Sequence, residues 1–338
     1  QGQAPQKQIS GIDGAVGYSI AANGTATRAA GAATADQRSE FYRHPVTMVR
    51  AALDPGAKLA NPRTLNNERI VDVTTADGLK FTLAIDGTTG RPTRVVSMAD
   101  NTNLGDVAIE TSFAEYQAVG GLQLPARLTT TVDRYTIADL HVTKQAVDGN
   151  AGDLAAPPAA ATAPVPSAPP AVVSVEDVAP GVWFLAGQSH HSVLVEFKDH
   201  LTLIETPQND ARALAVIAKA RELRPGKPLT EVINTHHHFD HSGGIRAAVS
   251  EGLTVVTHKA NAAFYQEAVR RAHTIVPDAL GKNPKELKLT TVDEELTLKD
   301  DQMTLVLYPI AGNPHADTLL MAYFPKYQVL VEADVYNS

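Results

Sequence analysis

The sequence contains no cysteine among its 338 residues. Disulfide bonds and thiolate metal ligands are therefore both excluded, and any metal site must be built from histidine and carboxylate side chains. Long apolar runs are also lacking, since no stretch approaches the roughly 18 apolar residues that a membrane-spanning helix needs. The sequence therefore predicts a protein without a membrane span.

Positive charge is in deficit, with 29 lysines and arginines against 37 aspartates and glutamates and a formal net charge of −8. Nucleic-acid binding depends on neutralising phosphates, so this balance argues against a nucleic-acid partner and favours a small-molecule substrate. The hydrophobic fraction of 43% is enough for two domains with ordinary cores. Nothing in the composition constrains the oligomeric state.

The chain begins with Gln1 in a polar leader, residues 1–8. We interpret this leader as the mature end that remains after removal of a signal peptide, which predicts a periplasmic or secreted location. A start introduced for expression is the alternative.

Residues 1–150 are predicted to form a β-rich accessory domain. A helix is expected at 35–53, ended by Pro55-Gly56. Alternating apolar residues and the turn signal at 76–78 then predict an antiparallel sheet. Its strands are expected at 69–74, 79–85, 93–98, 107–116, 122–132 and 135–142. Through the segments 85–92 and 116–125, this half resembles the curved-sheet domains of periplasmic lipoprotein-carrier proteins, and we assign it a binding, docking or stabilising role.

Residues 151–173 are predicted to be a linker. The stretch 154–171 is an alanine and proline tract with six prolines, a composition that cannot fill a core and prefers extended polyproline conformations. We expect a semi-rigid spacer that marks the domain boundary. A proline-rich recognition motif is the alternative.

Residues 174–338 are predicted to form an α/β domain. Helices are expected at 210–224, 243–249 and 259–272, the first of them capped by Asn209 or Asp210. Strands are expected at 175–185, 192–197, 201–205, 229–234, 254–257, 296–298, 303–308, 318–324 and 328–331. Polar residues that follow the apolar strands should gather at one rim, where α/β folds keep their functional loops.

The densest polar cluster of the chain lies at 235–244, with the sequence Thr-His-His-His-Phe-Asp-His-Ser-Gly-Gly. In an extended loop the side chains alternate, so His236, His238 and Asp240 would point one way, and a turn would bring His241 back to them. Imidazole and carboxylate are ligands that zinc prefers. The alternative is a polyhistidine tag, but a tag lies at a terminus and lacks the aspartate and the Gly-Gly pair.

Four further residues are candidates for the same site. His315 follows the predicted strand 303–308, and Asp334 follows the predicted strand 328–331, so both stand just past apolar strands, as His236 does. We predict both to be metal ligands. His190 and His191 precede the strand 192–197 and are predicted to line a substrate pocket, with a plain surface loop as the alternative.

The spacing His-x-His-x-Asp-His, followed by a loop histidine and a strand-end aspartate, resembles the metallo-β-lactamase fold superfamily over residues 175–338. The resemblance implies an αββα sandwich with a dinuclear zinc site. In that site three histidines would hold the first metal, an aspartate and a histidine would hold the second, and Asp334 would bridge both. By position these are His236, His238 and His315 for the first metal, and Asp240 and His241 for the second. Glu205 stands where the family usually has an aspartate.

The resemblance also implies a last histidine ligand beyond the bridging aspartate, and none follows before Ser338. We therefore expect a sandwich that is incomplete at the C-terminus. A missing C-terminal part is favoured over a truncated paralogue or a site for one metal, because a half-sandwich would expose an apolar face and an open sheet edge.

The function implied is that of a hydrolase, in which a metal-bound hydroxide attacks an ester, thioester or lactone and Asp240 orients the nucleophile. A bridging carboxylate at the position of Asp334 is absent from the lactamases of the superfamily. We therefore favour these substrates over β-lactams. The alternatives are a β-lactamase, a phosphodiesterase or sulfatase, a degenerate non-catalytic metal-binding protein, and a di-iron redox protein with a flavin partner.

Overall fold

The computed structural model describes residues 9–335, which lie in two compact units. The first unit comprises Gln1–Ala99 and Val107–Ala168, and the second comprises Asp100–Asp106 and Pro169–Ser338. The polar leader at 1–8, on which the predicted location depends, and the chain end at Ser338 lie outside the described residues. Within residues 9–335, no helix combines the length and the apolar character needed to cross a membrane.

The first unit is β-rich, as the sequence predicts. A three-stranded sheet, β1 (Ile9–Asp13), β2 (Val16–Ile20) and β3 (Ala26–Arg28), lies in a region where no strand was expected. A seven-stranded sheet follows in the order β10-β9-β8-β7-β6-β5-β4. Its strands are β4 (Lys58–Leu65), β5 (Glu68–Thr74), β6 (Lys80–Asp86), β7 (Pro92–Asn101), β8 (Gly105–Val119), β9 (Leu122–Val132) and β10 (Tyr135–His141). Six of these match predicted strands, whereas β4 was missed.

The predicted helix at 35–53 is in fact two helices, α1 (Gly31–Tyr42) and α2 (Pro45–Ala52). The break falls at His44, whose backbone is extended (φ −90°, ψ 140°), because the ring of Pro45 disfavours a helical conformation in the residue before it. Pro45 itself suits the first turn of α2, where its missing N–H has no partner to lose. Met48 of α2 is fully buried and packs on Val73 and Phe81 of the large sheet.

The alanine and proline tract is not extended throughout, which corrects the sequence-based expectation. Residues Pro158–Thr162 form α3, which begins at a proline and continues through alanines with high helix propensity. Ala160 of α3 is fully buried and clusters with Ala156 and with Tyr18 of β2. Part of the predicted linker therefore packs within the first unit.

The second unit contains two sheets. The larger one has seven strands in sequence order, of which β11 to β14 are antiparallel and β14 to β17 are parallel. Its strands are β11 (Ser174–Ala179), β12 (Val182–Ala186), β13 (Ser192–Glu196), β14 (Leu201–Ile204), β15 (Leu229–Asn234), β16 (Thr254–His258) and β17 (Lys288–Val292). The predicted strand at 175–185 is split at Gly181, whose φ of +80° suits a turn. Strand β17 was not predicted.

The smaller sheet of the second unit has four antiparallel strands, β18 (Leu296–Lys299), β19 (Thr304–Pro309), β20 (Leu320–Phe324) and β21 (Val329–Val331). The helical segments are α4 (Asp210–Leu223), α5 (Phe239–Ser242), α6 (Ile245–Ser250), η1 (Lys259–Asn261), α7 (Ala262–Ala268) and α8 (Ala279–Lys282). The predicted helix at 259–272 thus ends four residues early and starts as a 3₁₀ turn. The helix α8 was not predicted.

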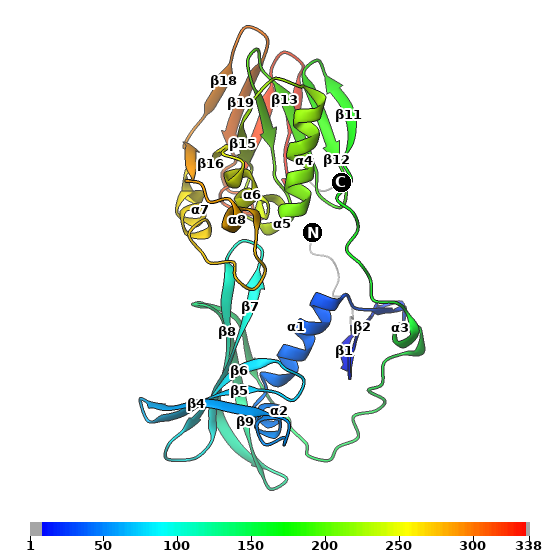
Figure 1. Cartoon of the computed structure of the whole chain (residues 1–338), viewed down its shortest axis with the longest axis vertical. Coiled ribbons are helices and arrows are strands. Elements are labelled where there is room, and N and C mark those ends of the chain that lie inside the picture. Colours follow the sequence, from blue (N-terminus) through cyan, green and yellow to red (C-terminus); the bar gives the residue numbers. More distant parts are fainter. Residues whose placement is uncertain (1–8, 336–338) are drawn as a thin grey trace. The chain divides into compact units, whose positions relative to one another are not determined.

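The two faces of the larger sheet are covered differently, because successive side chains on a strand point to opposite faces. Leu194 of β13 packs with Val216 and Ile217 of α4, and Figure 1 shows this helix running along the sheet. On the other face, Val193 and Val195 join a core with residues of the smaller sheet. A helix layer and two sheet layers result. They confirm the predicted α/β sandwich preceded by an antiparallel β-rich domain.

Candidate metal centre

Strand β15 delivers the histidine motif to the rim of the larger sheet. After Asn234 the chain continues through Thr235 and His236, both fully or almost fully buried, to a single helical turn, α5. The prediction of an extended loop through Asp240 is wrong, because helical backbone begins at Phe239. His236 and His238 still point the same way, whereas Asp240 is carried on the helical turn to a separate group.

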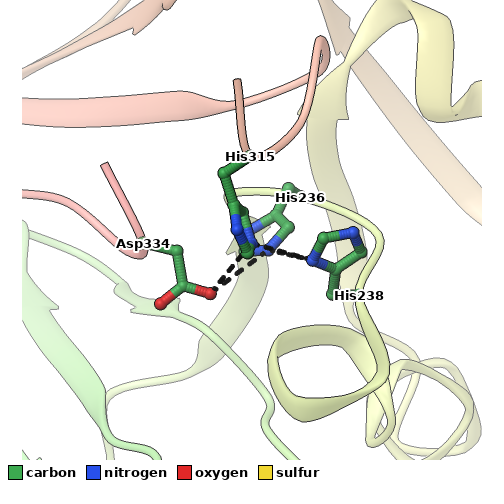
Figure 2. Close-up of side chains that lie close together, drawn as sticks. All are labelled: His236, His238, His315 and Asp334. Atoms are coloured by element: carbon green, nitrogen blue, oxygen red, sulfur yellow. Dashed lines mark hydrogen bonds and ion pairs between the residues drawn. The ribbon is translucent and has the colours of Figure 1, made fainter. Parts of the chain in front are cut away.

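Four side chains of the second unit converge on one point. The groups are the Nε2 atoms of His236 and His315, Nδ1 of His238 and Oδ2 of Asp334, and all of them lie within 4.8 Å of one another. His238 Nδ1 is 3.2 Å from His236 Nε2 and 2.9 Å from His315 Nε2. Asp334 Oδ2 is 3.1 Å from His315 Nε2 and 3.7 Å from His236 Nε2. Figure 2 shows the four side chains directed toward one another.

These separations fit a zinc-sized ion. Tetrahedral zinc binds imidazole nitrogen at about 2.0–2.1 Å, which places neighbouring ligand atoms roughly 3.3 Å apart. The two histidine–histidine distances of 3.2 and 2.9 Å are close to that value. The far nitrogen of His236, Nδ1, lies 3.1 Å from the hydroxyl oxygen of Thr235, as expected for a ligand ring held by an outer partner. We call His236, His238, His315 and Asp334 the first group.

His315 and Asp334 reach the first group from the smaller sheet. His315 lies in the loop between β19 and β20, where its backbone N–H donates to Asn313 Oδ1 at 2.8 Å. Asp334 follows β21 and has a φ of +62°, in the left-handed region that aspartate and asparagine tolerate better than most residues. Both residues lie just past strands, at the places expected from the sequence.

Burial keeps the central imidazoles neutral. Desolvation, followed by repulsion from His241 and His238, lowers the pKa of His236 to about 2. Desolvation also lowers the pKa of His241, against the opposing attraction of Asp334. Neutral imidazole is the form that binds a metal ion, so these two side chains are ready to act as ligands at neutral pH.

A second group lies beside the first and contains His190, Asp240 and His241. One ligand atom from each lies within 4.8 Å of the other two, and His190 Nε2 is 3.2 Å from Asp240 Oδ2. His241 Nε2 is also 3.0 Å from Asp334 Oδ2, so the aspartate of the first group touches the second. His191 is not part of this group, because its Nδ1 accepts the N–H of Gly187 and its ring packs against Phe184.

The remaining two residues of the motif point elsewhere. The Nδ1 atom of His237 lies 3.2 Å from the hydroxyl of Thr318, and its ring packs edge-on against Phe264. The side chain of Phe239 is exposed. Neither residue joins a ligand group.

A buried polar network supports the motif from below. Glu205 accepts the N–H of Thr235 at 2.8 Å and the side-chain amide of Asn234 at 3.0 Å. The same amide donates to the carbonyl of His241 at 3.1 Å, and the hydroxyl of Tyr265 donates to the other end of Asn234. Asn234 and Tyr265 were not identified from the sequence. Glu205 thus holds the loop through its neighbours.

We expect Glu205 to make stability depend on pH in the metal-free protein. Desolvation raises its pKa from 4.5 to about 8, so the side chain is protonated in the fold at neutral pH. The pKa of Glu205 is higher in the folded than in the unfolded chain, so protonated Glu205 favours the folded state. That contribution to the free energy of unfolding is lost as pH rises from about 4.5 through about 8. Between pH 5.5 and 8, each rise of one pH unit should lower the free energy of unfolding of the unaltered protein by about 1.4 kcal/mol relative to that of Glu205→Gln. Urea unfolding at several pH values measures this difference.

The control for that experiment is Glu286→Gln, which changes an exposed glutamate. Its unfolding free energy should follow that of the unaltered protein at every pH. Parallel pH curves for Glu205→Gln and the unaltered protein would show that Glu205 is ionised in the fold.

A cavity of about 380 Å³ opens at the second group. Phe184, Val193, Ile204 and Val331 contribute apolar walls, and His190, His241 and Asp334 contribute the polar end. Among the described residues that line it there is no lysine or arginine. Both His190 and His191 lie in the wall, at the place expected from the sequence.

Comparison with known proteins gives a family match within the second unit. The family model described as the metallo-beta-lactamase superfamily matches residues 185–335. A linear primary-alkylsulfatase from a Pseudomonas species is 40% identical over 58 residues, which make up 17% of this chain and only 9% of the sulfatase.

Solved structures match at low similarity. A metallo-beta-lactamase from Pontibacter korlensis is 20% identical with a TM-score of 0.37, and the match covers 47% of this chain and 70% of that one. A metallo-beta-lactamase from Hirschia baltica is 19% identical with a TM-score of 0.36, over 47% of this chain and 69% of that one.

Proposed function

We propose that the chain is a metal-dependent hydrolase of esters, thioesters or lactones, on the basis of the match of residues 185–335 to the metallo-beta-lactamase superfamily model. The observation that carries the proposal is the convergence of three imidazole nitrogens and one carboxylate oxygen within 4.8 Å. That carboxylate, from Asp334, also lines a cavity large enough for a small substrate. Zinc is the metal we expect, since the donor set contains only nitrogen and oxygen.

In this proposal His236, His238 and His315 would hold the ion together with the carboxylate of Asp334. When bound, zinc supplies a Lewis acid and lowers the pKa of a water molecule toward neutrality. The carboxylate of Asp240, which lies 3.2 Å from His190 Nε2 in the second group, would orient that water and accept its proton. The side chains of Phe184 and Val331 line the cavity beside its polar end.

The wall of the cavity favours neutral acyl substrates over sulfate or phosphate esters. Enzymes that bind such anions commonly place arginine or lysine against them. The described wall carries the carboxylates of Glu332 and Asp334 and no such cation. An uncharged ester, thioester or lactone avoids repulsion from these groups.

Hydrolysis of a sulfate ester is the second candidate, and the 58-residue match to an alkylsulfatase favours it. The two candidates differ in the charge of the scissile group. A substrate panel separates them, with an aryl ester, an acyl thioester, a lactone, an alkyl sulfate, a phosphodiester and a β-lactam. Turnover of only the alkyl sulfate would replace our proposal with the second candidate. Bound metal without any turnover would identify a non-catalytic metal-binding protein.

Removing the metal tests the role of the first group directly. We expect dialysis against a chelator to lower ester or lactone hydrolysis by at least about 100-fold, because a metal ion supplies several kcal/mol of transition-state stabilisation. Adding zinc back should restore the rate. Initial rates and metal content are measured on the same samples, with far-UV circular dichroism to check that the fold persists. Full activity in metal-free samples would contradict the proposal.

A further inference from the structure

We propose that His190 is a ligand of the second metal position, for which the family resemblance already names Asp240 and His241. The inference rests on the proposed function in one respect: the metal position of the first group and the second metal position would belong to the same hydrolytic site. The sequence offered His190 as a substrate contact, and its distance to Asp240 gives it a more specific role.

Geometry is the first argument. His190 Nε2 lies 3.2 Å from Asp240 Oδ2, near the roughly 3.3 Å expected between two ligand atoms of tetrahedral zinc. One ligand atom from each of His190, Asp240 and His241 lies within 4.8 Å of the other two. The rings of the two histidines meet edge to face, with their centroids 4.9 Å apart. Two histidines and one carboxylate are a sufficient protein ligand set for zinc, which leaves a further coordination position open.

The orientation of His190 is held by outer partners, as is usual for a ligand histidine. Its other ring nitrogen, Nδ1, lies 2.8 Å from the hydroxyl oxygen of Ser189. The side-chain amide of Gln208 donates to that hydroxyl at 2.6 Å, and the backbone N–H of Gln208 donates to the carbonyl of Asp240 at 3.1 Å. Gln208 therefore links the segment that carries His190 to the helical turn that carries Asp240.

The backbone of the same segment is anchored in the core. Arg212 of α4 is fully buried and donates to the carbonyls of Leu185 at 3.1 Å and of His190 at 3.4 Å. Gly187 allows this close approach, because a Cβ atom there would lie 2.1 Å from the carbonyl oxygen of Val172. The buried arginine therefore fixes the backbone at His190, as a ligand position requires.

The second position would lie next to the first. His241 Nε2 is 3.0 Å from Asp334 Oδ2, and Asp334 Oδ2 is 3.1 Å from His315 Nε2. Asp334 thus touches a histidine of each group and can serve as the shared carboxylate of a dinuclear centre. The competing interpretation is a plain ion pair between His190 and Asp240 without metal.

Metal stoichiometry separates these interpretations. The metal-free chain is titrated with zinc by calorimetry, and metal per chain is measured by mass spectrometry after gel filtration. We expect two zinc ions for the unaltered chain and one for His190→Ala, with the second dissociation constant raised by at least about 100-fold. His191→Ala is the matched control and should keep two. Ser189→Ala should keep two but bind the second ion about 10–100-fold more weakly.

Cobalt gives an independent readout, because the visible absorption of each bound cobalt ion reports its ligands. His190→Ala should lose the spectral component of the second ion and keep that of the first. Circular dichroism checks that each variant is folded, and His190→Gln replaces His190→Ala if the alanine variant is not. Two ions bound with unchanged affinity in a folded His190 variant would overturn the inference.

The outcomes also separate this inference from the proposed function. One ion at the first group with active ester or lactone hydrolysis would overturn the second position and leave the proposed function standing. Two bound ions, the second of which requires His190, without turnover of any substrate in the panel would support the second position and overturn the proposed function. An unaltered chain that binds no metal would overturn both.

Discussion

Replacing His236 with alanine should lower the rate of ester or lactone hydrolysis by at least about 1,000-fold and remove the metal of the first group. His236 is fully buried, and its Nε2 lies 3.2 Å from His238 Nδ1 at the centre of that group. Loss of a catalytic metal removes several kcal/mol of transition-state stabilisation, and each 1.4 kcal/mol is about tenfold in rate. Steady-state kinetics and metal analysis of the same preparation measure the two losses.

The matched control is His237→Ala, one position along the chain. His237 faces Thr318 and Phe264 and stays outside both ligand groups, so its loss should change the rate by only a few-fold and leave the metal content unaltered. Equal effects of the two substitutions would mean that the loss of activity comes from disturbing the loop and not from removing a metal ligand. An active His236→Ala variant would refute the assignment of the first group.

Replacing Asp334 with asparagine should lower hydrolysis by about 100- to 1,000-fold and reduce the zinc content. Its Oδ2 atom lies 3.1 Å from His315 Nε2 and 3.0 Å from His241 Nε2, so one charge serves both groups. Asparagine is the appropriate replacement because the backbone at this position has a φ of +62°, which asparagine tolerates and alanine does not. The kinetic loss therefore reports the lost charge rather than backbone strain.

Asp301→Asn is the control for that substitution. Asp301 is an exposed carboxylate that pairs with Lys198 on the surface of the second unit, so its replacement should leave both rate and zinc content unchanged. Zinc titration of Asp334→Asn adds a second readout, since both binding steps should weaken. Normal activity and two tight binding steps in Asp334→Asn would remove Asp334 from the centre.

The strands were largely predictable from two signals. In the first unit, β8 alternates in burial along much of its length, which leaves a period of two in the sequence. In the second unit, β13 and β14 are buried almost throughout and leave short apolar runs. The elements that were missed lack both signals. Strand β4 is exposed along its whole length, and β17 has one buried residue. The break between α1 and α2 had a signal, since Pro45 restricts the residue before it, but the apolar pattern on either side obscured it.

The support for the motif could not be predicted from spacing. Glu205 and Asn234 are 29 residues apart, and they meet because β14 and β15 pair in parallel with Ile204 opposite Ile233. Tyr265 reaches Asn234 from α7, another 31 residues on. Which strands are neighbours, and in which register, depends on the packing of the whole unit.

By itself, the sequence determined that a centre of this kind would use histidine and aspartate, because the chain has no cysteine and places four histidines and an aspartate in six residues. It also determined that His315 and Asp334 would stand at strand ends. The resemblance assigned His236, His238 and His315 to one metal and Asp240 and His241 to another. Only the tertiary structure decided that His190 lies with the second set. The helical turn α5 carries Asp240 away from His236 and His238, and the anchored loop before β13 brings His190 to meet it. Both depend on contacts between segments far apart in the chain, which local patterns do not encode.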